Sequence, residues 1–156
     1  MSVRKSDREI CDRKEIVDFL SSCDTIRIGF FDREYPYVVP VSFGLEDNGE
    51  ALILYYHGAI VGKKNELAKL NPNVCVEADC FNQYVKLHDG VTADYQSFIG
   101  FGKVYECLEE EKERGLALLM KHCGYDEYTP GGCSIFDYTD VRKIVLESFS
   151  CKKRFK

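Results

Sequence analysis

The chain has 156 residues, 45% of them hydrophobic and 30% charged, with a formal net charge of -5 at pH 7. This length suits one ordinary domain, and the composition is typical of a globular protein with a sizeable core. The negative charge excludes a general electrostatic attraction to nucleic acid or to anionic membranes, so any anion-binding site must be local.

The cysteines and the N-terminal residues favour a cytoplasmic protein. The eight cysteines contain no C-x-x-C pair, and the three histidines do not complete a set of zinc ligands. The first residues are charged, without the apolar segment of a signal peptide, and no apolar run approaches the ~18 residues of a membrane span. We therefore expect reduced thiols that pack as small hydrophobic residues.

A helix over residues 7–22 is the first predicted element. Ser6 and Glu9 have the spacing of a capping box, and apolar residues then recur every three or four positions. The β-branched and aromatic run at 25–32 predicts the first strand.

A β-hairpin is predicted next. Its strands are 37–46 and 51–57, and the sequence Asp-Asn-Gly-Glu at 47–50 supplies the turn. Pro40 lacks the N–H that a sheet ladder needs. The first strand should therefore lie at a sheet edge or beside something other than a strand.

The second half of the chain predicts alternating strands and helices. Asn71-Pro72 ends a helix over 61–70. Gly100 and Gly102 predict a bulge or a close backbone approach within a strand. The remaining expected elements are strand 73–81, a polar loop at 83–94, strand 95–108, helix 109–123, a surface loop or short helix at 125–140, strand 141–151 and a basic tail at 152–156.

These elements predict a single domain over residues 1–156, mainly β with flanking helices. Six strands and three helices, joined by hairpins instead of regular β-α-β units, indicate a small antiparallel barrel decorated by helices.

Four positions could carry chemistry. Gly62-Lys63-Lys64 opens a helix, where backbone N–H groups and lysine charges favour a phosphate; the alternative is a solvated turn. His57 ends the preceding strand and could transfer a proton near neutral pH, or be an ordinary half-buried side chain. Ser42 and Ser97 could each donate a hydrogen bond to a ring carbonyl or a phosphate.

The ordered motifs resemble the FMN-binding split-barrel superfamily of pyridoxamine 5′-phosphate oxidase, and most of all its 5-nitroimidazole reductase branch. The motifs are P-Y-V-V-P-V-S-F-G, Y-H-x-A-x-x-G-x-K, N-P-x-V-C-x-E and Y-x-S-x-I-G-x-G, and the resemblance covers most of the chain. It implies a six-stranded antiparallel split barrel that forms a homodimer, with FMN at the subunit interface.

The resemblance also implies which residues bind the cofactor. Lys63 and Lys64 match the basic pair on the FMN phosphate, and Ser97 matches a polar contact from the long fifth strand. His57 and Gly58 match a strand-end pair beside the flavin, with His57 nearest the substrate. The strand beside the flavin ring matches Val39, Pro40, Val41 and Ser42.

The implied function is an FMN-dependent oxidoreductase that reduces small nitroaromatic or quinone-like acceptors, with NAD(P)H as a candidate electron donor. Lys63 stands where the family often has arginine, which removes a bidentate contact. The C-terminal arginine motif for pyridoxamine phosphate is absent, so vitamin B6 oxidase activity is not expected. The alternatives are a flavin-binding electron carrier without catalysis and, less favoured, haem binding through His57 or His88.

Overall fold

The computed structural model describes residues 4–127 and 136–155. These residues form an antiparallel sheet of eight strands in the order β3-β2-β6-β7-β8-β5-β4, with β1 paired to the end of β8. The strands are β1 (Glu9–Ile10), β2 (Ile26–Phe30), β3 (Tyr37–Val41), β4 (Gly44–Asp47), β5 (Leu52–Ala59), β6 (Asn73–Leu87), β7 (Gly90–Glu106) and β8 (Thr139–Arg154). The helices are α1 (Arg13–Ser21), α2 (Lys63–Leu70) and α3 (Glu109–His122), with short 3-10 turns at Ser6–Arg8 and Phe136–Tyr138.

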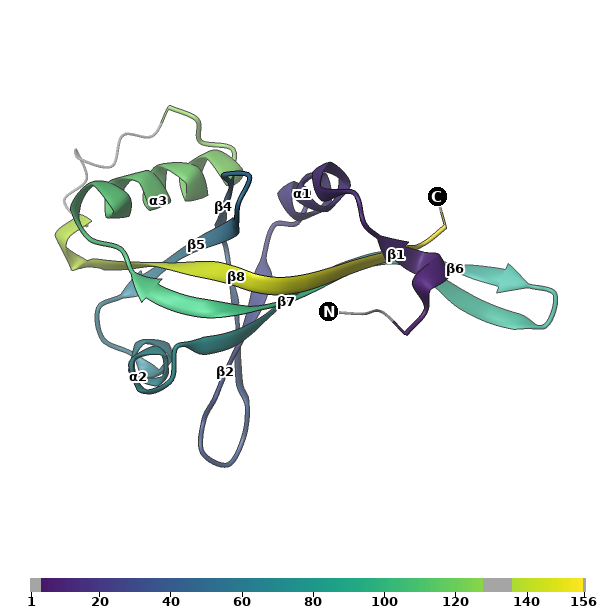
Figure 1. Ribbon diagram of the computed structural model, residues 1–156, viewed down its shortest axis with the longest axis horizontal. Helices are drawn as coiled ribbons and strands as arrows, with labels where there is room; N and C mark the ends of the chain where they lie inside the picture. Colours follow the sequence, from purple (N-terminus) through teal and green to yellow (C-terminus); the bar gives the residue numbers. More distant parts are fainter. Residues whose placement is uncertain (1–3, 128–135, 156) are drawn as a thin grey trace.

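The inner face of the sheet holds the hydrophobic core. Side chains alternate between the faces of a strand, so every second residue of β2 lies in this core, as do Leu52, Leu54 and Tyr56 of β5. Ile26, Ile28, Leu52 and Leu54 have no exposed surface. Figure 1 shows α1 and α3 on one side of the long strands β7 and β8, and α2 on the other side. Within the described ranges, no helix is long and apolar enough to cross a membrane.

The structure confirms the fold class, mainly β with flanking helices. The six expected strands are all present, but 37–46 is two strands, β3 and β4, separated at Ser42 and Phe43. The break has a packing cause: Phe43 turns fully into the core, and a Cβ on Gly44 would lie 2.6 Å from the backbone nitrogen of Leu119 in α3. The predicted bulge is also present, between Phe101 and Gly102.

The predicted helix 7–22 was wrong at its beginning. Ser6 and Glu9 form no capping box; α1 begins at Arg13, and the side chain of Asp12 accepts a 2.9 Å hydrogen bond from the Glu15 N–H. Residues 9–10 instead pair with the end of β8, which buries Ile10 in the core. Burial of an apolar side chain prevailed over the local capping pattern.

Two further predictions were wrong. The polar segment 83–94 is not a loop, because β6 and β7 continue through it and turn at His88-Asp89. This hairpin projects beyond the rest of the molecule (Figure 1), so the polar composition reflects strands exposed on both faces. Residues 152–154 are not a tail but the end of β8, paired with Tyr95–Ser97. Of the segment 125–140, residues 128–135 lie outside the described part of the chain.

Candidate functional site

The connection from β5 to α2 forms one corner of the candidate site. Gly62 is the N-cap of α2 and has no side chain to accept hydrogen bonds from the first-turn N–H groups. Asn65, which is 2% exposed, donates from its side-chain nitrogen to the carbonyls of Ala59 and Ile60 and fixes the connection. The helix therefore presents its positive N-terminal end beside the end of β5.

Lys64 lies across the end of β5. Its Nζ donates a 3.0 Å hydrogen bond to the backbone carbonyl of His57 and lies 5.1 Å from the centre of the Tyr56 ring. A Cβ added to Gly58 would lie 2.6 Å from this nitrogen, so a larger residue at this position would displace the ammonium group. Partial burial lowers the pKa of Lys64, and Asp140 opposes that shift.

Lys63 points to a different group of side chains. Its Nζ lies 2.5 Å from a carboxylate oxygen of Asp32 and 4.8 Å from the centre of the Tyr37 ring. This ion pair raises the pKa of Lys63 and lowers that of Asp32. The two neighbouring lysines thus contact different strands: Lys64 contacts β5, and Lys63 contacts the β2–β3 region.

Strand β8 adds a buried ion pair that the sequence analysis missed. Arg142 Nε lies 2.6 Å from an Asp140 carboxylate oxygen, and the two side chains are only 6% and 9% exposed. Asp140 pairs with Gly58, and Arg142 pairs with Tyr56. The sequence contained a signal for this ion pair, because Asp140 and Arg142 occupy alternate positions on the apolar face of a strand. Two opposite charges that are buried on one face are expected to pair with each other. We call Tyr56, Gly58, Lys64, Asp140 and Arg142 the Lys64 corner.

His57 lies at the exposed end of β5, where its neighbours Tyr56 and Gly58 face the Lys64 corner. Although the residue keeps contact with solvent, packing around the ring and then the Lys64 ammonium lower its pKa below the ordinary 6.5. The imidazole is therefore neutral at pH 7, when it both donates and accepts hydrogen bonds.

The predicted residues 39–42 occupy the edge strand and the turn after it. β3 is the terminal strand of the sheet, so Pro40 lies at an edge as expected. Val39 and Val41 pack against the core, whereas Pro40 and Ser42 are exposed. An exposed edge followed by a polar residue leaves room for a ligand or for a second chain.

Ser97 lies far along the sheet from the Lys64 corner. It pairs with Lys152, whereas Arg142 of that corner pairs with Glu106. Along β7, Ser97 and Glu106 are nine positions apart. At about 3.3 Å per residue this is roughly 30 Å of strand, the diameter of a small domain. One protomer therefore does not bring Ser97 to the Lys64 corner.

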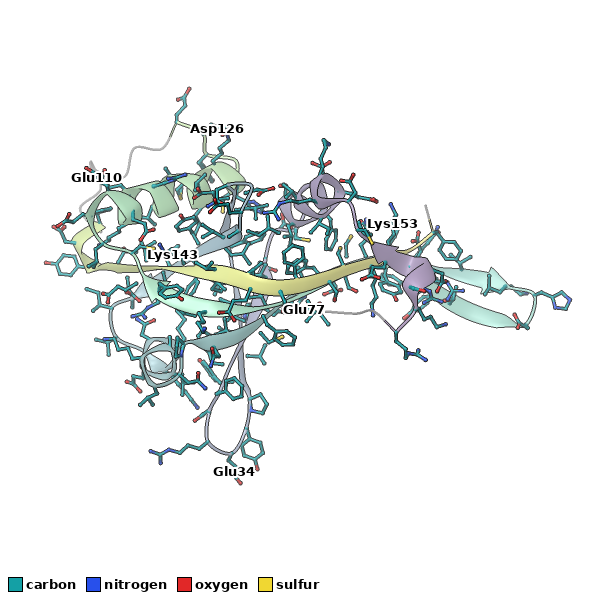
Figure 2. All side chains as sticks on the ribbon, viewed as in Figure 1. Glu34, Glu77, Glu110, Asp126, Lys143 and Lys153 are labelled. Carbon is teal, nitrogen blue, oxygen red and sulfur yellow. The ribbon has the colours of Figure 1, made fainter. Side chains whose placement is uncertain are left out.

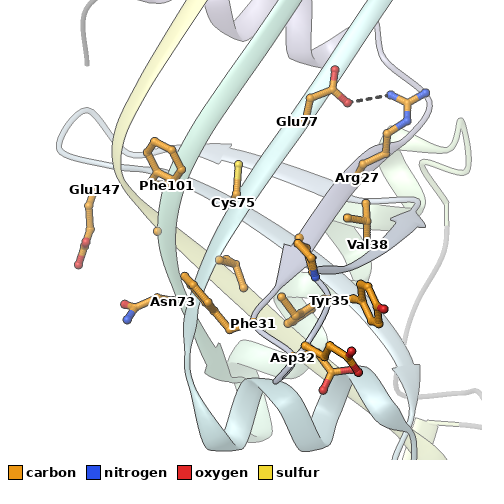
Figure 3. Close-up of a pocket in the computed structure, with 16 residues that line it drawn as sticks. Arg27, Phe31, Asp32, Tyr35, Val38, Asn73, Cys75, Glu77, Phe101 and Glu147 are labelled. Carbon is orange, nitrogen blue, oxygen red and sulfur yellow. Dashed lines mark hydrogen bonds and ion pairs between the residues drawn. The ribbon is translucent and has the colours of Figure 1, made fainter.

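An apolar pocket opens on the outer face of the sheet, away from the core (Figure 3). It has a volume of about 710 Å³ and is formed by β2, the β2–β3 loop, β3 and the adjoining parts of β6, β7 and β8. Cys75 and Phe101 are paired neighbours on its floor, and Arg27 and Glu77 form a 3.1 Å ion pair at its rim. Figure 2 shows that Glu34 projects at the tip of the β2–β3 loop. We call this cavity the outer-face pocket.

The sequence matches the family model of pyridoxamine 5′-phosphate oxidase over residues 12–152. The chain belongs to this family. No curated protein matches it significantly. The Lys64 corner and the outer-face pocket both lie within the matched residues, so they are features of a pyridoxamine 5′-phosphate oxidase family member.

Solved structures share this fold. A protein from Bacteroides thetaiotaomicron ascribed to 5-nitroimidazole antibiotic resistance is 28% identical, with a TM-score of 0.79 over 92% of this chain and 85% of that chain. The flavocytochrome Anf3 from Azotobacter vinelandii is 17% identical, with a TM-score of 0.76 over 99% of this chain and 73% of that chain. A FAD and heme binding protein from Mycobacterium smegmatis is 13% identical, with a TM-score of 0.75 over 96% and 74%.

The residues at the Lys64 corner fit a phosphate group. The buried Tyr56 hydroxyl there can donate a hydrogen bond and has no partner among the described residues. Lys64 and Arg142 supply two cations against the single carboxylate of Asp140, and the helix N-terminus adds positive potential. No group of three or more metal-ligating side chains occurs among the described residues.

Proposed function

We propose that this protein binds FMN with the phosphate at the Lys64 corner. The single observation that carries the proposal is the position of Lys64, whose ammonium lies over Gly58 beside an uncapped helix N-terminus. Phosphates bind at helix N-termini because the N–H groups and the helix dipole both favour negative charge. Membership of the pyridoxamine 5′-phosphate oxidase family supports a flavin as the ligand.

We further propose that a second copy of the chain completes the site. Ser97, the matched polar contact on β7, is too far along the sheet to reach the Lys64 corner of its own protomer. Val38 and Phe101 in the outer-face pocket are 57% and 45% exposed, an apolar surface that a homodimer would cover. A homodimer with FMN between its subunits would use both surfaces.

The proposed activity is reduction of small nitroaromatic or quinone-like acceptors, with NAD(P)H as electron donor. Bound FMN would supply the hydride and electron transfer, and the protein would supply binding, orientation and access. Neutral His57 would hydrogen-bond the acceptor beside the cofactor. The Bacteroides protein ascribed to 5-nitroimidazole resistance, at 28% identity, supports this substrate class.

The absorption spectrum of the purified protein, with identification of the released chromophore, tests the proposal first. A flavin spectrum with FMN released on denaturation is the expected result. A Soret band would indicate haem instead, and a colourless protein that takes up no FMN would contradict flavin binding. NAD(P)H oxidation with nitroaromatic acceptors then tests catalysis; bound FMN without turnover would favour the electron-carrier alternative.

The dimer is tested by sedimentation of the wild type and of Val38→Asp. A charge in the outer-face pocket should weaken an apolar subunit contact and produce monomers with reduced FMN occupancy. Leu108→Asp places the same charge on an exposed apolar residue outside this pocket and should leave the dimer intact. A wild-type monomer that retains FMN would contradict the shared site.

A further inference from the structure

We infer that Arg142 is the second cation of the phosphate site and that it acts with Lys64 and the Tyr56 hydroxyl. Lys63, the neighbour that the sequence favoured, does not take this part. The inference rests on the proposed binding of a phosphate-bearing cofactor and adds residues of β8 that no sequence motif assigned.

The geometry separates Lys63 from the site. Its ammonium is already paired with Asp32, 2.5 Å away, and lies over Tyr37 at the beginning of β3. Recruiting Lys63 to a phosphate beside Gly58 would require breaking this ion pair. Lys64 needs no such change, because its ammonium already lies against Gly58 and the His57 carbonyl.

Arg142 lies on the strand next to β5, on the face that Lys64 covers. It is the β8 partner of Tyr56, and Asp140 is the partner of Gly58, so the ion pair lies beside the residues that Lys64 covers. A guanidinium group has five N–H donors. Among the described residues, Arg142 makes one hydrogen bond, from Nε to Asp140. Its outer nitrogens therefore have donors to offer to an anion.

The Tyr56 hydroxyl is the second, independent observation. The residue is 1% exposed, and its hydroxyl oxygen has no hydrogen-bond partner in the part of the chain that the structure describes. A buried hydroxyl without a partner has lost its hydrogen bonds to water without replacement, so native proteins usually satisfy such groups. An anion held between Lys64 and Arg142 would supply the missing acceptor.

The charges also favour a phosphate monoester. The corner contains two cations and one carboxylate, so it holds one uncompensated positive charge in a half-buried setting. A phosphate monoester carries about -1.5 to -2 charges at pH 7 and several acceptor oxygens. Asp140 would orient Arg142 through its Nε and leave the outer nitrogens free for the phosphate.

Affinity for FMN and for riboflavin, which lacks the phosphate, isolates the contribution of this site. Both dissociation constants are measured on the apoprotein by flavin fluorescence. We expect Lys64→Gln and the double variant Asp140→Asn/Arg142→Gln to weaken FMN binding at least about tenfold with riboflavin unchanged, as charged hydrogen bonds imply. The double variant leaves no buried charge unpaired, which protects folding. Lys63→Gln is the matched control and should keep the wild-type ratio of the two constants.

Tyr56→Phe is expected to change stability and FMN affinity in opposite directions. Removing an unpartnered buried hydroxyl should leave the Tm of the apoprotein equal or higher, while FMN binding weakens several-fold and riboflavin binding is unchanged. A higher Tm with an unchanged FMN-to-riboflavin ratio would show that the hydroxyl meets only water, and would overturn its assigned role.

Inorganic phosphate separates this inference from the proposed function. If phosphate raises the Tm of the wild type but not that of Asp140→Asn/Arg142→Gln, the anion site stands even if no flavin binds. If FMN binds to the wild type and the double variant keeps the wild-type ratio of the FMN and riboflavin dissociation constants, the flavin proposal stands and the role of Arg142 is refuted. If Lys63→Gln and Lys64→Gln weaken FMN binding by the same factor, both lysines bind the phosphate and the inference is refuted.

Discussion

Gly58→Ala gives a sharp test of the phosphate position, because one methyl group would displace the lysine without touching the backbone of another element. The added Cβ would lie 2.6 Å from Lys64 Nζ and 2.8 Å from its Cε. Ordinary contacts at such a carbon are 3.4–4 Å, so the ammonium must move by about 1 Å. That movement breaks its 3.0 Å hydrogen bond to the His57 carbonyl.

The expected cost falls on binding and not on folding. Loss of the hydrogen bond between the displaced ammonium and the phosphate would cost about 1.5–3 kcal/mol of binding free energy, which corresponds to roughly a 10- to 100-fold weaker Kd for FMN. Because the colliding atoms belong to the flexible end of a lysine, the chain can relax, and alanine is no worse than glycine within a strand. We expect the Tm of the apoprotein to change by no more than a few degrees.

The assay is a fluorescence titration of the apoprotein with FMN and with riboflavin. Gly90→Ala is the matched control, because a Cβ there has nothing within 4 Å. The reasoning is refuted if Gly58→Ala binds FMN as tightly as the wild type does. It is equally refuted if FMN and riboflavin binding weaken by the same factor, because the lysine would then not act on the phosphate.

Four further measurements test the fold and the electrostatics. Gly102→Ala places a Cβ against the backbone carbonyl of Val145 at the bulge, so we expect a loss of about 2–4 kcal/mol in urea unfolding; a loss below 1 kcal/mol would contradict this packing. His57 should titrate below its ordinary 6.5 in NMR spectra, and Lys64→Gln should raise its pKa only part of the way, because burial is the larger cause. The stability that neutral His57 provides above pH 6.5 should decrease as the pH falls through the lowered pKa. Burial raises the pKa of Cys107 to about 12, so peptide mapping after iodoacetamide treatment should find it alkylated only in the unfolded protein.

Local patterns predicted most of the secondary structure because the forces that form it are local. Asn71-Pro72 ends α2 in any context, and the acidic beginning and basic end of α3 match the helix dipole. Pro40 correctly indicated an edge strand, since proline cannot donate to a ladder. The errors arose where a partner distant in sequence decided the outcome: residues 9–10 pair with β8, and 152–154 pair with β7.

The candidate site also has a part that the local sequence determined and a part that depends on tertiary structure. The sequence by itself determined the family resemblance, the helix that opens after Gly62, and the proximity of His57, Gly58 and the lysines, because these lie within eight residues. Which lysine faces the end of β5 was decided by tertiary structure, since it depends on where Asp32 lies. The register of β5 against β8 places Arg142 beside Tyr56, although 86 positions separate them in the chain. Strand pairing joins residues at any sequence separation, and only the folded sheet could reveal that ion pair beside Lys64.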